Sequence, residues 1–186
     1  MNVLAFDTGT TTGWCLFSVD EKRPIKWGKF TLEVDEKKVM KERILGTRLH
    51  QFEVQLISLM KDLIVHEGGF YFVGAEILSM QRNMKVTIYL SSLLGILSKV
   101  TEENIKIPVS FYYVTEAKKA LTGKGNLEKI QVLQFLNHKY DMKLVEPEFT
   151  KTGNLRAGTG DLDIADATAI AHILFLDVQR ARRLLE

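Results

Sequence analysis

The hydrophobic pattern of the chain changes its period near residue 35, and this change limits the possible folds more than any other feature of the sequence. Before it, apolar, β-branched and aromatic residues form three short runs, 3–6, 14–19 and 26–33, separated by polar turns. Such runs are typical of β-strands, and their short connections predict an antiparallel meander. After it, over 39–66, apolar residues recur every three or four positions, which is typical of one face of an α-helix.

The later part of the chain alternates between strand-like and helix-like segments. A helix between two strands favours a parallel pair, so this order predicts an α/β fold. The expected architecture is a five-stranded mixed sheet, with three antiparallel strands followed by two parallel ones, helices on both faces and a single domain over 1–186. The expected segments are strands at 70–75 and 108–114, helices at 85–100, 115–121, 126–140 and 161–185, with Thr115 and Asn126 as N-caps of the two short helices, and a loop at 146–160.

The composition is that of a folded globular protein. The 186 residues are 46% hydrophobic, and only 3 are Pro and 13 Gly, which excludes fibrous and linker-like chains. The single cysteine, Cys15, excludes an internal disulfide and an all-cysteine zinc site, so a reducing compartment is expected. Apolar stretches fall short of the roughly 20 residues of a membrane-spanning helix, and residues 1–6 are too short for a signal peptide. We therefore expect a cytoplasmic protein without a membrane partner.

Four carboxylates lie at the ends of the expected elements. Asp7 ends the first strand, Glu76 ends the fourth, and Asp163 and Asp166 lie near the start of the last helix, where a spacing of three residues puts them on one face. Taken singly, such acids are often turn formers or partners of the helix dipole. A carboxylate such as Glu76, which follows an apolar run, needs a partner or a metal. If the four converge, oxygen ligands favour Mg²⁺ or Mn²⁺, and two such ions are typical of phosphodiester hydrolysis.

A lysine-bearing loop precedes one of the short helices. Lys124 lies between Gly123 and Gly125, and Lys129 follows one turn later. Glycines let a backbone approach a phosphate, and a helix start favours anions, although the spacing is not that of a Walker A loop. A solvated surface turn is the alternative. The surrounding segment, 116–143, holds six lysines against three acids, and Lys118 and Lys119 in it are further candidates for contacts with nucleic-acid phosphates.

Four segments together resemble the RuvC-type Holliday-junction resolvases among the ribonuclease H-like nucleases. They are 4–9 with 12–14, 74–76, 122–132 and 163–171, in this order along nearly the whole chain. The Gly-Lys-Gly loop followed by Glu-Lys is the most family-specific of them. The opening, with three threonines before a Gly-Trp pair, is closer to the phage and prophage branch of that family.

The resemblance implies a Mg²⁺-dependent endonuclease that resolves four-way junctions and acts as a homodimer in the cytoplasm, or in a host-cell cytoplasm if phage-encoded. It implies that Asp7, Glu76, Asp163 and Asp166 bind two metal ions and that Lys124 and Lys129 contact the phosphate near the scissile bond. The chain lacks the aromatic residue that follows the glutamate in cellular relatives. Met80 is a candidate for the same wedge, and Arg82 a candidate contact to the DNA backbone.

Other readings remain open from the sequence. An RNA-processing nuclease of the same fold would keep the acids without the Gly-Lys-Gly loop. An actin-like or sugar-kinase domain could share the first Asp-Gly-Thr turn, but it needs a second domain for which 186 residues leave no room. A non-catalytic DNA-binding domain would not need four acids. Cys15, Trp14 and Trp27 are expected to pack in the core, and His172 to face away from the acids.

Overall fold

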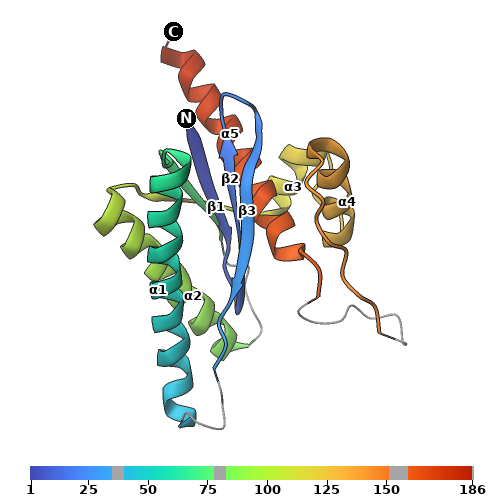
Figure 1. Ribbon diagram of the computed structural model, residues 1–186. Helices are drawn as coiled ribbons and strands as arrows, with labels where there is room; N and C mark the ends of the chain where they lie inside the picture. The colour runs from blue at the N-terminus through green and yellow to red at the C-terminus, as the bar shows by residue number, and fades with distance from the viewer. Residues whose placement is uncertain (35–39, 78–82, 151–158, 186) are drawn as a thin grey trace.

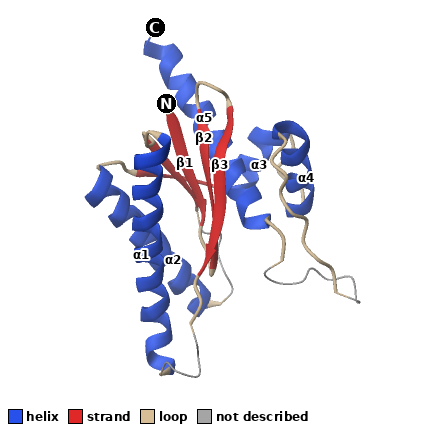
Figure 2. Cartoon of the chain, viewed as in Figure 1, coloured by secondary structure: helices blue, strands red, loops and turns tan. Residues whose placement is uncertain are grey.

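The computed structural model describes residues 1–34, 40–77, 83–150 and 159–185. Figure 1 traces its elements along the chain, and Figure 2 separates helices from strands. The strands are β1 (Asn2–Asp7), β2 (Thr11–Ser18), β3 (Arg23–Thr31), β4 (Phe72–Glu76) and β5 (Val109–Tyr112). The helices are α1 (Lys41–Glu67), α2 (Met84–Ile105), α3 (Val114–Thr122), α4 (Lys129–Tyr140) and α5 (Leu162–Leu185).

The five strands form one mixed sheet in the order β3-β2-β1-β4-β5. The pairs β1–β2 and β2–β3 are antiparallel, whereas β1–β4 and β4–β5 are parallel. This confirms the predicted meander followed by two parallel strands. Strand β1 is therefore central, and the carboxyl ends of β1, β4 and β5 meet at one edge of the sheet.

Helices cover both faces of the sheet, with α1 and α2 on one side and α3, α4 and α5 on the other (Figure 1). The alternation of side chains along β1 explains the two layers. Val3 and Ala5 belong to the core beneath α3, α4 and α5, whereas Leu4 and Phe6 belong to the core beneath α1 and α2. All four side chains are fully buried, so the sheet is apolar on both faces.

The two short helices begin at other residues than the sequence predicts. Helix α3 begins at Val114 after Tyr113, not after Thr115, and its start has no side-chain cap. Helix α4 begins after Glu128 rather than Asn126, because Glu128 and Gln131 form a reciprocal capping box. In that box the backbone N–H of Glu128 donates to Oε1 of Gln131 over 2.9 Å. Lys129 is consequently the first residue of the helix rather than a residue inside it.

Most other predicted bounds shift by a few residues. Strands β2 and β3 each begin three residues before the predicted start, and α5 begins at Leu162. The predicted helix from residue 39 begins at Lys41, and residue 39 lies outside the described residues. Of the predicted loop 146–160, residues 151–158 also lie outside them. None of the helices in the described part of the chain combines the length and the apolar character that crossing a bilayer would take.

The core predictions for single residues hold. Cys15 is fully buried, and Trp14 is 8% exposed. The ring of Trp14 lies over Gly28 of β3, where a side chain would not fit. Trp27 is partly buried against the core beneath α5. His172 is buried too, and its Nδ1 lies 3.0 Å from the hydroxyl of Tyr140, away from the carboxylates.

Candidate active site

Strand pairing brings Asp7 and Glu76 together. Asp7 is the last residue of β1 and lies opposite Gly13 of β2. Phe6 pairs with Ala75, so the next residue on each parallel strand, Asp7 and Glu76, are neighbours at the same edge of the sheet. Alternation along the strands points both side chains to the face that α5 covers.

Gly13 brings the start of α5 onto the same place. A Cβ atom at Gly13 would lie 2.2 Å from the backbone carbon and oxygen of Asp163, so only glycine lets the first turn of the helix rest on β2. Gly13 is the cross-strand neighbour of Asp7, and Asp163 is thereby held next to that strand end. The glycine in the opening motif thus serves a helix-to-sheet contact.

Asp166 lies beneath this first turn and is fully buried. Nζ of Lys129 lies 2.6 Å from its Oδ2 and 3.6 Å from Oδ2 of Asp7. Nζ of Lys118 lies 3.8 Å from its Oδ1. Among the described residues, neither Asp166 oxygen has a hydrogen-bond partner of acceptable geometry. Its compensation is therefore ionic and comes from the two lysine ammonium groups.

The four predicted carboxylates act on one another electrostatically. Burial raises the pKa of Asp7 well above its ordinary value; Lys129 opposes the rise, whereas Asp166, Glu76 and Asp163 add to it. Burial likewise raises the pKa values of Glu76 and Asp163, with a further contribution from Asp166 to each. Crowded, buried acids of this kind favour either protonation or a bound cation.

Lys129 is the counter-ion of this cluster. Although burial opposes it, the carboxylates of Asp7 and Asp166 raise the pKa of Lys129, so the side chain remains charged. Its side chain is 44% exposed and reaches the acids from the first turn of α4. The shifted start of α4 therefore matters, because it puts this lysine at the end of the helix nearest the acids.

The oxygen ligands that these acids offer suit a hard divalent metal, although their side chains lie too far apart to bind one as they stand. In the described part of the chain, no three His, Cys, Asp or Glu side chains are close enough to form a metal cluster as they stand. The ammonium of Lys129 lies between Asp7 and Asp166. The buried oxygens of Asp166, which accept no hydrogen bond from the described residues, and the all-oxygen set nevertheless fit Mg²⁺ or Mn²⁺, which prefer such ligands.

The other predicted basic residues fall into three environments. Lys118 is buried rather than exposed: its Nζ donates to the carbonyl of Leu127 over 3.1 Å and approaches Asp166. It is therefore an internal support of the site and not a surface contact for a phosphate. Lys119 and Lys124 are exposed. Arg82 and Met80 lie outside the described residues.

The two glycines of the Gly-Lys-Gly loop are required by the local backbone conformation and packing. Gly123 ends α3 with a φ of 82°, a left-handed conformation that favours glycine. A Cβ atom at Gly125 would lie 2.8 Å from the carbonyl oxygen of Thr115. The backbone N–H of Lys124 donates to the hydroxyl of Thr122 over 3.2 Å. The loop thus presents the side chain of Lys124 to solvent, while its backbone is committed to internal contacts.

Sequence reasoning missed one pair at the start of α5. Lys29 of β3 forms an ion pair with Asp161, at 2.9 Å between Nζ and Oδ1. The other carboxylate oxygen of Asp161 accepts the backbone N–H of Val145 over 2.9 Å. Nothing in the strand pattern around Lys29 distinguishes it from a solvated lysine.

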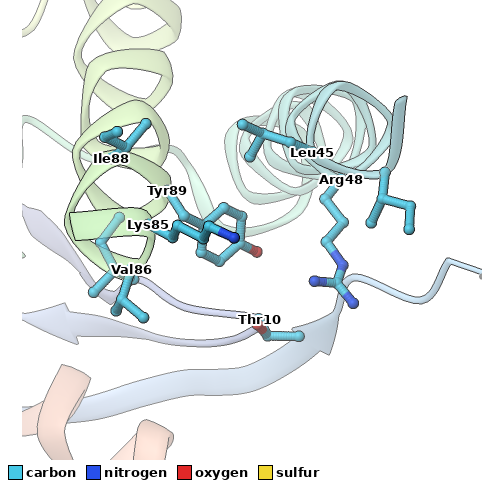
Figure 3. Close-up of a pocket in the computed structure, with 9 residues that line it drawn as sticks. Thr10, Leu45, Arg48, Lys85, Val86, Ile88 and Tyr89 are labelled. Atoms are coloured by element: carbon cyan, nitrogen blue, oxygen red, sulfur yellow. The ribbon is translucent and has the colours of Figure 1, made fainter. Parts of the chain in front are cut away.

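A groove opens between α1 and α2 next to the loop that follows Asp7. It has a volume of about 810 Å³ and is lined mainly by apolar side chains. Figure 3 shows Leu45 and Arg48 of α1 on one side, Ile88 and Tyr89 of α2 on the other, and Thr10 at the base. The groove is therefore adjacent to the strand end that carries Asp7.

Comparisons with known proteins agree with this arrangement. A family model described as crossover junction endodeoxyribonuclease RuvC matches residues 40–173. The curated crossover junction endodeoxyribonuclease RuvC of Magnetococcus marinus is 27% identical over 139 residues, which cover 73% of this chain and 70% of that protein.

Solved structures show the same fold. Thermus thermophilus RuvC superposes with a TM-score of 0.66 at 19% identity, covering 97% of each chain. The yeast mitochondrial Holliday junction resolvase Ydc2 gives a TM-score of 0.56 at 14% identity, covering 98% of this chain and 82% of that one. The fold is ribonuclease H-like, as the sequence predicts.

Proposed function

Because the chain belongs to the RuvC family of crossover junction endodeoxyribonucleases, we propose that it resolves four-way DNA junctions by hydrolysing phosphodiester bonds in a divalent-metal-dependent reaction. Other branched DNAs are further candidate substrates. Family membership does not favour the RNA-processing or kinase-like readings. The observation that carries the proposal is the convergence of acids from β1, β4 and α5 around the ammonium of Lys129.

Asp7, Glu76, Asp163 and Asp166 would hold the metal ions, most favourably Mg²⁺, with Mn²⁺ as a substitute. When bound, such ions activate a water and stabilise the leaving oxygen of a phosphodiester. Support for this comes from the raised pKa values of Asp7, Glu76 and Asp163, because a bound cation would relieve the crowding of negative charge that raises them.

Two lysines would have different tasks at this site. Lys129 neutralises Asp7 and Asp166 before DNA arrives and is 44% exposed, so its ammonium can also meet a phosphate oxygen and offset developing negative charge. Lys118 is buried and donates a hydrogen bond to the carbonyl of Leu127, so it would stabilise the charge of Asp166 from within the protein. Lys119 and Lys124, exposed just ahead of Lys129, would contact phosphates farther along the strand.

A second copy of this chain would complete the enzyme, because cutting two opposed strands of one junction needs two sites and this chain supplies one. The groove between α1 and α2 fits such an interface. Met84 and Ile88 of α2 are 71% and 51% exposed, and Leu45 of α1 is 41% exposed. Exposed apolar side chains around a groove are typical of a contact surface. A monomer in sedimentation at micromolar concentration, with and without junction DNA, would contradict this.

The decisive experiment compares DNA substrates with one protein preparation. The protein is incubated with Mg²⁺ and a fixed four-way junction, a three-way junction, a flap, linear duplex or a structured RNA, and products are resolved on denaturing gels. We expect paired cuts in opposed strands of the four-way junction and none in the duplex. Equal cleavage of all four DNAs, or cleavage of structured RNA in preference to them, would reject junction resolution as the function.

A further inference from the structure

The edge strand β3 supplies none of the four acids, yet it is attached to the start of the helix that carries two of them. Nζ of Lys29 donates to the carbonyl oxygen of Gly160 and lies 2.9 Å from Oδ1 of Asp161. The side chains of Lys29 and Asp161 are 32% and 17% exposed, so the pair is only partly screened by solvent. Gly160 and Asp161 are the two residues that immediately precede α5.

Strand register explains why a residue of β3 can reach this point. Lys29 lies opposite Gly13, which lies opposite Asp7, so the three form a row across the sheet. Directly paired residues share a face, which is here the face that α5 covers. Gly13 has no side chain, and the first turn of α5 rests on it. The side chain of Lys29, on the edge strand, therefore lies next to the contact between Gly13 and the first turn of α5.

Asp161 connects three segments at once. Its Oδ2 accepts the backbone N–H of Val145 over 2.9 Å, and its own N–H donates to the Val145 carbonyl over 2.9 Å. Its carbonyl oxygen accepts the N–H of Ala165 over 3.0 Å, which is the first hydrogen bond of the helix. The ion pair with Lys29 therefore acts on a residue that is rigidly continuous with α5 and with the segment after α4.

We propose that Lys29 is a positioning residue: through Asp161 and Gly160 it sets where the first turn of α5 lies, and thus where Asp163 and Asp166 stand relative to Asp7. This inference rests on the proposed metal-dependent function of those acids. The need for it is electrostatic. Four carboxylates repel one another, so the end of α5 is pushed away from the sheet unless it is held.

The test replaces Lys29 by methionine, which keeps the length and the apolar stem but removes the charge. In metal-free Lys29→Met protein, we expect faster amide hydrogen exchange in peptides that cover the start of α5. In the junction-cleavage assay, the Mg²⁺ concentration for half-maximal rate should rise about tenfold, the usual size of effect when a residue that orients metal ligands is lost. Lys29→Arg should restore both measurements.

Lys26→Met is the matched control. Lys26 lies on the same strand with a similar exposure of 36%, and its ammonium lies 3.3 Å from Asp62 and 3.0 Å from Glu67 of α1. The control therefore also removes a lysine with two acidic partners from β3, but on the side away from the site. It should change neither α5 exchange nor the Mg²⁺ requirement. If Lys29→Met and Lys26→Met behave alike in both measurements, the positioning role is rejected.

A second variant, Asp161→Asn, keeps an acceptor for the Val145 N–H and removes the partner charge. We expect it to change both measurements in the same direction as Lys29→Met but by less, because the bond from Lys29 to the Gly160 carbonyl remains. The double variant should be no worse than Lys29→Met alone, because that variant already removes the ion pair. Additive losses would overturn the proposal. A wild-type protein that cuts no DNA would instead reject the proposed function, whereas the exchange comparison would still decide whether Lys29 holds α5.

Discussion

On the face of the sheet covered by α1 and α2, strand β1 buries Leu4 and Phe6 in an apolar core. On the face covered by α5, the same strand buries Val3 and Ala5 and then ends in Asp7, which is joined by Asp166 from the helix above. Both faces exclude water, but only the second buries charge at one end. The first face should therefore contribute mainly to folding stability. The buried acids at the end of the second face should lower stability and serve the proposed metal-dependent reaction.

The largest effect that separates the two faces is expected from Asp7→Asn. If Asp7 binds metal as proposed, its loss removes several kcal/mol of transition-state stabilisation, so junction cleavage should fall by about 10³-fold. Because a neutral amide relieves the repulsion around a buried acid, the metal-free melting temperature should not fall. Cleavage rates, junction binding by gel shift and thermal unfolding are measured on the same sample. Wild-type cleavage by the variant would refute the assigned role of Asp7.

Leu56→Ala makes the opposite test on the other face. Leu56 of α1 is fully buried beneath the sheet, so the cavity should lower the free energy of unfolding by about 2–5 kcal/mol. Cleavage per folded molecule should remain unchanged at temperatures well below the melting transition. Urea denaturation followed by circular dichroism gives the first quantity, and a rate normalised to folded protein gives the second. A loss of activity without a loss of stability would remove the distinction between the faces.

Gly13→Ala should lower both folding stability and cleavage, because Gly13 packs against the backbone of Asp163, one of the four acids. The added Cβ would lie 2.2 Å from the Asp163 backbone, so the start of α5 must move. Overpacking of this kind costs about 1–3 kcal/mol of stability, and cleavage should fall with it. Gly46→Ala is the control, since nothing lies within 4 Å of its added Cβ. The control should be neutral or slightly stabilising, as alanine favours a helix.

The smallest effect is expected from Lys124→Ala, outside both cores. Its side chain is exposed, so folding should be unaffected. Losing one phosphate contact should weaken junction binding modestly and reduce the slope of log affinity against log salt by about 1. Fluorescence anisotropy over a salt series measures both, with Lys61→Ala on α1 as an exposed control. An unchanged slope would show that Lys124 does not meet DNA.

The sequence predicts the sheet and the positions of the acids in it well, because both depend on short-range patterns. Apolar runs end at Asp7 and Glu76, and strand ends of a parallel pair necessarily meet. The spacing of Asp163 and Asp166 follows from helical geometry alone. These inferences need no knowledge of which segments pack together.

The residues that surround and position the acids could not be predicted from the sequence, because their contacts are tertiary. Lys118 is like any lysine on a short helix until α4 covers it. Asn126 is a good cap by residue type, but the reciprocal bonds of Glu128 and Gln131 move the N-cap two residues later, to Glu128. Lys29 gains its partner 132 residues away in sequence, through the packing of α5 at Gly13.

The acids of the site come from opposite ends of the chain, Asp7 from the first strand and Asp166 from the last helix. During synthesis the ribosome releases β1 long before α5 exists, so an unfinished chain holds only part of the charge cluster. The same missing helix leaves Val3, Ala5 and Phe17 uncovered, and contacts so distant in sequence form late and slowly. The complete charge cluster, and with it the proposed metal-dependent activity, can therefore form only when the fold is complete.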